Sequence, residues 1–198
     1  MIYYLYCDNN MEQIREYFEK ITKLSDQEWN FFSSKLTRVV KPKKTFLLKA
    51  PAIEDHLAFI EKGIVRHYIP KDENDITYAF SFSGEFVSGY ESFLTRTPAI
   101  CNIETLTECV FWQVSYNDLE DIYKNTDAGN IIGRKASEML FLEKSKRELS
   151  LLNDTAEERY LNLFKEQPQL IQFIPQKYLA SYIGITPQAL SRIRKRIS

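Results

Sequence analysis

The sequence predicts an α+β fold in which a β-rich region lies between two helical regions. Between about residues 39 and 115, short runs of aromatic and β-branched residues alternate with turn residues, which is the pattern of antiparallel strands. The segments before and after this region place apolar residues at helical spacing. The composition supports a buried core, because 44% of the 198 residues are hydrophobic and 27% are charged. It excludes a wholly disordered, collagen-like or disulfide-framework protein.

Helices are expected on both sides of the strands. Residues 11–21 form an amphipathic pattern with one apolar face. The apolar positions are Ile14, Tyr17, Phe18 and Ile21. Ser25 is followed by Glu28, a capping box that predicts the start of a second helix. A similar box at residues 155–158 predicts another helix beyond the strands.

Strand-like runs follow one another at intervals of about ten residues in the central region. They are the segments 45–48, 56–60, 63–69, 75–80, 100–106 and 109–114. Many short strands at such spacing predict an antiparallel sandwich or barrel. A scaffold of this kind can enclose a pocket.

A long helix is expected at residues 128–152, after a short helix that Ser115 and Asp118 open. Some apolar residues of the long helix approximate the a/d spacing of a coiled coil, although lysines interrupt the pattern. The apolar residues are Ile132, Met139, Leu142 and Leu149, and the lysines are Lys135 and Lys146. This helix either forms a dimer interface or packs on its own β-rich region. We favour the dimer because of the segment that follows.

Charge is divided unevenly along the chain. The net charge is −1, but residues 167–198 contain no Asp or Glu and carry five positive charges. The rest of the chain has 21 basic and 27 acidic residues. A basic end on an acidic body favours a polyanion-binding site near the C-terminus, although such a cluster alone is also typical of a solvated surface.

Residues 175–198 predict two helices joined by a tight turn. Pro175 suits the first turn of the first helix, where its missing N–H does no harm. Gly184 supplies the left-handed residue that ends this helix. Thr186 is then the N-cap of the second helix and Pro187 its first residue.

The second helix has an apolar stripe and a polar stripe on different faces. The apolar stripe consists of Leu190, Ile193 and Ile197, and the polar stripe of Gln188, Ser191, Arg192 and Lys195. The small, glycine and apolar positions of a helix-turn-helix are occupied by Ala180, Gly184, Ile185, Leu190 and Ile193. The alternative is an ordinary helical hairpin with a solvated basic face.

The exposed residue types of this motif suit DNA, because arginine pairs with guanine and glutamine with adenine in the major groove. The expected base contacts are Gln188, Ser191 and Arg192. The expected phosphate contacts are Lys177, Arg194, Lys195 and Arg196. Thr186 and Pro187 lie at the entrance of the helix, where the Thr186 hydroxyl either donates to a phosphate or only caps the helix.

With these parts in this order, the chain resembles the bacterial CRP/FNR superfamily of transcription regulators. Residues 59–66 (FIEKGIVR) resemble the glycine turn and following arginine of the family's cyclic-nucleotide-binding-like jelly roll. Residues 82–87 (FSGEFV) resemble its later turn. Residues 188–192 (QALSR) resemble its recognition-helix pattern E-x-x-S-R, with Gln188 in place of the glutamate. The resemblance covers nearly the whole chain after about Met11.

The resemblance implies three parts. They are a β-roll sensor domain with N-terminal helices (1–127), a dimerisation helix (128–153) and a helix-turn-helix DNA-binding domain (154–198). The implied homodimer places two recognition helices in successive major grooves of double-stranded DNA. Family members often continue into a β-hairpin wing, whereas we expect no wing here because the sequence stops at Ser198.

The resemblance does not extend to the phosphate cassette of members that bind cyclic nucleotides. There, Gly-Glu is followed about ten residues later by Arg-Ser, and the Arg-Ser equivalents here are Ala99 and Ile100. The main counter-charge of a cyclic phosphate is therefore missing, and Arg96 is displaced by about three residues. We do not expect cyclic AMP to bind, and either another small molecule or the protein's own side chains would fill the pocket. The candidate effector contacts are Ser88, Gly89, Tyr90, Glu91, Ser92 and Asn102.

Iron–sulfur and haem cofactors are not expected either. The three cysteines form no CxxC pair, and Cys7 alone lies where oxygen-sensing members carry an N-terminal cysteine cluster. The two histidines, His56 and His67, have no surroundings that specify a haem or metal site.

We therefore predict a homodimeric, sequence-specific DNA-binding transcription regulator with a small-molecule effector, which contacts RNA polymerase if it activates. A cytoplasmic location without membrane contact is expected, because no apolar run spans a bilayer and residues 1–7 form a poor signal peptide. The alternative is a small-molecule-binding or protein-interaction module of the same fold. An enzyme is not expected, since no nucleophile–histidine pair, metal-ligand cluster or phosphate-cradling glycine loop is visible.

Overall fold

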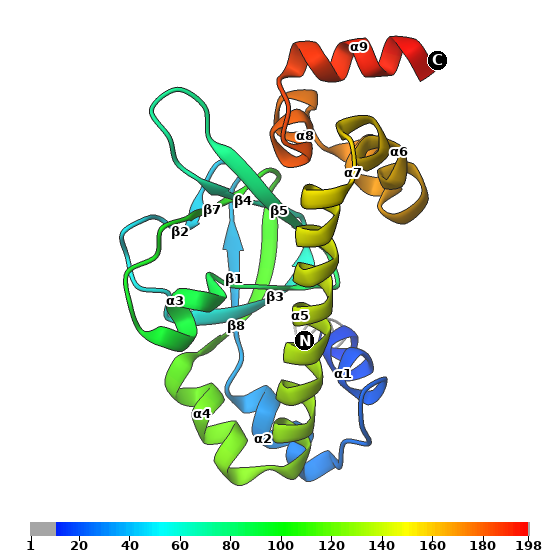
Figure 1. Cartoon of the computed structure of the whole chain (residues 1–198). Coiled ribbons are helices and arrows are strands. Elements are labelled where there is room, and N and C mark those ends of the chain that lie inside the picture. The colour runs from blue at the N-terminus through cyan, green and yellow to red at the C-terminus, as the bar shows by residue number, and fades with distance from the viewer. Residues whose placement is uncertain (1–10, 198) are drawn as a thin grey trace, which may run out of the picture. The chain divides into compact units, whose positions relative to one another are not determined.

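The structure is a computed structural model that describes residues 11–197 (Figure 1). The chain forms two compact units. Unit 1 runs to His67 and resumes from Phe80 to Glu138, and unit 2 comprises Tyr68–Ala79 and the chain from Met139 onward. The division falls inside the long helix and assigns the tip of one β-hairpin to the C-terminal unit. Within residues 11–197, no helix combines the length and hydrophobicity that a membrane span requires.

Unit 1 begins with two helices, α1 (Glu12–Glu19) and α2 (Asp26–Ser34). The predicted capping box is confirmed, because the Ser25 hydroxyl accepts the N–H of Glu28 and the Glu28 carboxylate accepts the N–H of Ser25. α1 buries Ile14 and Phe18, which belong to the predicted apolar face. α2 therefore starts from a local hydrogen-bonded cap, and burial of one face holds both helices in place.

The strands form two four-stranded sheets, in the orders β1-β8-β3-β6 and β2-β7-β4-β5. The strands are β1 (Thr37–Lys41), β2 (Phe46–Leu48), β3 (His56–Lys62), β4 (Ile64–Ile69), β5 (Ile76–Phe82), β6 (Phe86–Val87), β7 (Asn102–Thr105) and β8 (Cys109–Ser115). In the first sheet β8 pairs antiparallel with β1 and β3, and β3 with β6; β2 and β7 also pair antiparallel. The predicted α+β class with an antiparallel β domain is confirmed.

Both faces of the inner strands β3 and β8 are largely buried, which explains why these two strands have almost continuous apolar sequences. Along β8, Phe111 belongs to one core cluster, whereas its neighbour Trp112 belongs to another that includes residues of α1, α2 and α4. Ile60 and Phe59 of β3 divide between the same two clusters. Successive side chains of a strand point to opposite faces, so one strand contributes to both cores.

Three elements of unit 1 have no counterpart in the sequence prediction: β1, β6 and the helix α3 (Tyr90–Thr95). β1 is largely exposed, while β6 has only two residues and α3 only six. Elements this short, or this exposed, contain too few buried positions for a period of 2.0 or 3.6 residues to be recognised.

Two helices follow the strands: α4 (Tyr116–Asn125) and α5 (Asp127–Asn153). The Ser115 hydroxyl accepts the N–H of Asp118, which confirms the predicted start of α4. The apolar residues of α5 that were predicted at a/d spacing have two different surroundings. Ile132 packs against the core of unit 1. The other three residues are exposed: Met139 is 56%, Leu142 66% and Leu149 62% exposed. The first part of α5 thus covers its own β domain, and the later part presents apolar side chains.

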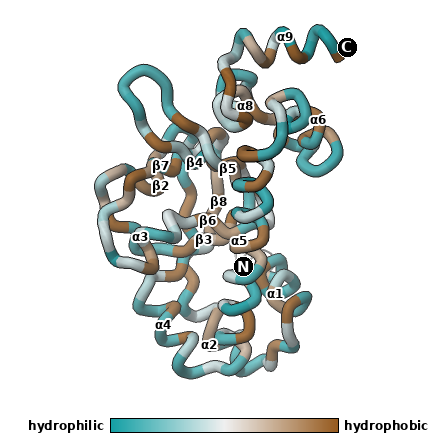
Figure 2. The backbone as a smooth tube through the Cα atoms, in the orientation of Figure 1, coloured by the Kyte–Doolittle hydropathy of each residue, from teal (hydrophilic) through white to brown (hydrophobic). Residues whose placement is uncertain are grey.

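Unit 2 contains the remaining helices, α6 (Ala156–Glu166), α7 (Pro168–Phe173), α8 (Gln176–Ile183) and α9 (Pro187–Ile197). The capping box of Thr155 and Glu158 forms as predicted. Pro175 lies at the N-cap of α8 and not in its first turn, a correction of one position. In Figure 2, α9 carries both hydrophobic and hydrophilic residues, as an amphipathic helix does.

Candidate nucleic-acid interface

Helices α8 and α9 form a helix-turn-helix. Gly184 ends α8 with φ of 82°, and the N–H of Ile185 donates to the carbonyl of Ala180. The Thr186 hydroxyl accepts the N–H of Ala189, so Thr186 caps α9 as predicted. Ala180 is fully buried in the unit, and this small residue allows the two helices to approach closely.

The two predicted stripes of α9 are separated by burial. Leu190 is 0% and Ile193 6% exposed, whereas Ile197 at the end of the stripe is 37% exposed. All four residues of the polar stripe are exposed: Gln188, Ser191, Arg192 and Lys195. Within residues 11–197 their side chains form no hydrogen bond or ion pair. α9 therefore presents one continuous surface of unused donors and positive charge.

The other predicted phosphate contacts occupy different positions. Arg194 and Arg196 are exposed on α9, and Lys177 is exposed on α8. Arg196 forms an ion pair of 2.6 Å with Glu157 of α6. An exposed pair of this kind is worth about 0–1 kcal/mol, so a phosphate can compete for the guanidinium. Ile185 and Ala189 line a shallow apolar hollow beside Arg192 and Arg196.

Two arginines that the sequence reading missed hold the C-terminal end of α8. Arg147 of α5 donates to the carbonyl of Tyr182 at 2.6 Å, and its guanidinium lies 3.7 Å from the centre of the Tyr182 ring. Arg159 of α6 donates to the carbonyl of Ile183 at 2.9 Å. Positive charge at a helix C-terminus is stabilising because the last carbonyls lack intrahelical partners. Burial lowers the pKa of the Arg147 guanidinium, which nevertheless remains protonated.

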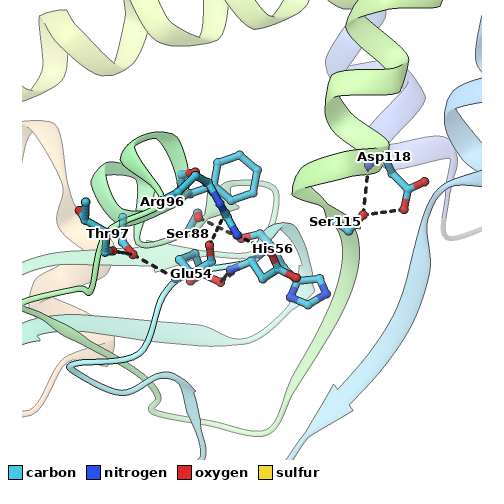
Figure 3. A network of polar contacts seen from close by, with 10 residues as sticks. Glu54, His56, Ser88, Arg96, Thr97, Ser115 and Asp118 are labelled. Atoms are coloured by element: carbon cyan, nitrogen blue, oxygen red, sulfur yellow. Dashed lines mark hydrogen bonds and ion pairs between the residues drawn. The ribbon is translucent and has the colours of Figure 1, made fainter.

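Most of the candidate effector residues lie at the start of α3 in unit 1, next to Glu54. The Glu54 carboxylate accepts a hydrogen bond from the N–H of Gly89 at 3.2 Å. The backbone N–H of Glu54 donates to the Ser92 hydroxyl at 3.0 Å. Ser88 is exposed and donates to the carbonyl of His56. Figure 3 shows Glu54, His56 and Ser88 gathered together. Gly89 and Ser92 are thus joined by hydrogen bonds to Glu54.

The other effector candidates make different contacts. Tyr90 is stacked on Phe93 and Glu91 is exposed. Asn102 is buried on β7, where its side-chain oxygen accepts the N–H of Ala50. Sequence reasoning named these residues but missed Glu54, which precedes β3 and carries no local motif.

The Arg96 side chain is bound by neighbouring residues of the same unit. It donates to the carbonyl of Glu54 at 2.7 Å, pairs with Asp55 at 2.6 Å, and lies 4.4 Å from the centre of the Tyr116 ring. Ala99, at the position of the cassette arginine, is 7% exposed and donates its N–H to the carbonyl of Ala52. Ala99 carries no charge and Arg96 is already paired, so neither residue supplies a free positive charge for a phosphate.

Among residues 11–197, no three or more His, Cys, Asp or Glu side chains are grouped so that they could hold a metal ion. His67 is buried and lies 3.0 Å from the Ser81 hydroxyl, and Cys109 is buried while Cys101 is half-buried. Cys7 and the predicted absence of a signal peptide at residues 1–7 fall outside the described residues.

Comparisons with known proteins agree with the resemblance to the CRP/FNR superfamily that the sequence indicates. Residues 38–126 match the family described as cyclic nucleotide-binding domain. The CRP-like protein Clp of Xanthomonas euvesicatoria pv. vesicatoria (strain 85-10) is 24% identical over 143 residues. That match covers 64% of this chain and 61% of the relative, so the matched region spans about three fifths of the curated relative's length.

Solved structures agree on the fold. The c-di-GMP responsive global regulator CLP from Xanthomonas campestris has a TM-score of 0.67 at 19% identity, covering 87% of this chain and 91% of that one. A putative transcriptional regulator of the CRP/FNR family from Eubacterium rectale ATCC 33656 has a TM-score of 0.68 at 16% identity, with coverages of 87% and 83%. At these identities the likeness shows the shared fold.

Proposed function

We propose that this chain is a sequence-specific, double-stranded DNA-binding transcription regulator of the CRP/FNR type and not an enzyme. The observation that carries the proposal is the exposed stripe of α9, where Gln188, Ser191, Arg192 and Lys195 have no partners within residues 11–197. A helix in the major groove needs free donors and acceptors at its start and positive charge along its sides. The helix-turn-helix geometry supports this use of the stripe.

The residues divide by the part of DNA that they can reach. Gln188 and Arg192 carry planar groups that form paired hydrogen bonds with adenine and guanine edges, respectively, and Ser191 lies between them on the stripe. Arg194, Lys195 and Arg196 give affinity through phosphates, together with Lys177 of α8. Specificity would therefore depend on the first group and salt-dependent affinity on the second.

A homodimer would use the later part of α5. Met139, Leu142 and Leu149 are exposed there, and Phe141 and Leu152 are 70% and 78% exposed. Apolar side chains in this number along one helix favour a second copy of the same helix as the partner. Two recognition helices would then read two half-sites about one helical turn apart.

We infer that the β domain of unit 1 does not hold a cyclic nucleotide through the usual phosphate cassette. Ten residues before Ala99, the cassette glutamate is replaced by Gly89, and a Cβ built on Gly89 would collide with the Leu48 side chain. The N–H of Gly89 donates a hydrogen bond to the Glu54 carboxylate and is therefore not free for a ligand. No buried side-chain polar atom among the described residues lacks a hydrogen-bond partner. The buried polar side chains of this segment are therefore satisfied by the chain itself.

The test is selection of bound sequences from a random duplex library, at high enough salt to suppress non-specific binding. We expect a two-fold symmetric motif with half-sites about one helical turn apart. Failure to enrich any motif, both with the pure protein and with cell extract added, would favour a protein-interaction module. A symmetric motif would also permit a screen for effectors, and for RNA polymerase recruitment if the protein activates.

The double variant Gln188→Ala/Arg192→Ala checks which residues read the sequence. Each lost base contact is worth about 1–3 kcal/mol, so affinity for the selected duplex should fall by roughly a hundredfold or more. Affinity for a scrambled duplex should fall much less. A matched control, Gln172→Ala/Lys165→Ala, removes an exposed Gln and Lys from α7 and α6 of the same unit and should leave the ratio of the two affinities unchanged. Equal losses on both duplexes would contradict base reading by α9.

A further inference from the structure

The tip of the β4–β5 hairpin belongs to the same compact unit as the helix-turn-helix. Ser181 of α8 makes the connection with one hydroxyl. Its oxygen accepts the N–H of Thr77 at 2.9 Å, and the same hydroxyl donates to the carbonyl of Asp75 at 2.9 Å. Thr77 is 1% exposed and Ser181 is half-buried. Both hydrogen bonds are part-buried, and they join the hairpin backbone to α8.

Helix α5 contacts both partners of this connection. The Lys144 ammonium lies 5.5 Å from the centre of the Tyr78 ring in the hairpin. One turn further along α5, Arg147 contacts the ring and the carbonyl of Tyr182, the neighbour of Ser181. The hairpin, α5 and α8 thus form a closed triangle of contacts within unit 2.

We propose that Ser181 is a positioning residue for DNA binding. The group formed by Ser181, Asp75 and Thr77, here termed the hairpin clamp, fixes α8. Because the buried side chains of Leu190 and Ile193 tie α9 to the rest of the unit, fixing α8 also fixes the exposed stripe of α9. This inference rests on the proposed DNA-binding function of α9.

The first arm of the test needs no DNA. In Ser181→Ala, hydrogen exchange at the amides of residues 75–78 should become roughly five- to tenfold faster, which corresponds to the loss of one or two hydrogen bonds. The control Gln176→Ala removes an exposed side chain from the same helix and should leave this exchange unchanged. Far-UV circular dichroism verifies that both variants remain folded. Unchanged exchange in Ser181→Ala would overturn the clamp itself.

The second arm measures affinity for the selected duplex and for a scrambled duplex of equal composition. If the clamp holds α9 in its binding orientation, Ser181→Ala should weaken specific binding, because the binding-competent orientation then makes up a smaller fraction of the population. Binding of the scrambled duplex should not change. Unchanged or tighter specific binding would overturn the positioning role. If the wild-type protein selects no duplex at all, the proposed function fails, and the exchange arm still decides whether the clamp exists.

Discussion

Arg147 shows how one residue connects the long helix with the helix-turn-helix. Its described contacts are the ring and the backbone carbonyl of Tyr182, so the charge is balanced by a helix C-terminus and an aromatic face. A hydrogen bond from a charged donor is worth about 1.5–3 kcal/mol, and a cation–π contact adds about 0.5–2 kcal/mol. Burial and the nearby Arg159 charge oppose these gains, as the lowered pKa of Arg147 indicates.

We therefore expect Arg147→Met, which keeps most of the aliphatic volume, to lower the free energy of unfolding by about 1–2 kcal/mol. Urea unfolding followed by circular dichroism provides the measurement. The control is Arg134→Met, which removes an exposed arginine from the same helix, paired with Glu138 one turn away, and should cost less than about 0.5 kcal/mol. Equal stability of the two variants would show that the contact with Tyr182 contributes nothing.

At the scale of the element, the turn between α8 and α9 depends on Gly184. Its φ of 82° lies in the left-handed region, where a residue with a Cβ is strained, although the Cβ itself would meet nothing closer than 3.7 Å. We expect Gly184→Ala to destabilise the protein by about 1 kcal/mol through backbone strain alone. Gly184→Asn should cost less, because asparagine tolerates this conformation. Thermal unfolding compares the two, and a smaller loss for alanine than for asparagine would refute the strain argument.

At the scale of the whole molecule, the exposed apolar residues of α5 predict association of two chains. Leu142→Asp places a carboxylate in the proposed interface, where its desolvation would cost several kcal/mol. We expect the dimer dissociation constant to rise by about a hundredfold or more, and binding to the two-half-site duplex to fall toward that of a single half-site. Sedimentation equilibrium measures the association.

Leu94→Asp is the matched control for this prediction. Leu94 is a similarly exposed leucine, at 55%, but it lies on α3 of unit 1. Association should be unchanged in this variant if the interface lies on α5. Loss of the dimer in both variants, or in neither, would argue against α5 as the dimer contact.

Several features could be read from the sequence because their physical cause is local. The boxes at Ser25 and Thr155 and the cap of Thr186 are hydrogen bonds between residues three positions apart, so the residue types alone predict them. Gly184 ends α8 for the same reason, since only its own φ is involved. The polar and apolar stripes of α9 follow from helical spacing. The α+β class and the candidate reading surface were therefore predictable.

Other features were decided by tertiary structure, because they join residues far apart in the chain. The bonds of Ser181 to the hairpin span 104 and 106 positions, and that of Glu54 to Gly89 spans 35. Nothing in the neighbourhood of Ser181 or Glu54 indicates such partners. The sequence by itself determined most of the elements, their order and the surface that α9 exposes. Only the tertiary structure decided that Glu54 is hydrogen-bonded to Gly89 and that the hairpin is hydrogen-bonded to α8. These contacts depend on which distant segments of the chain are packed side by side.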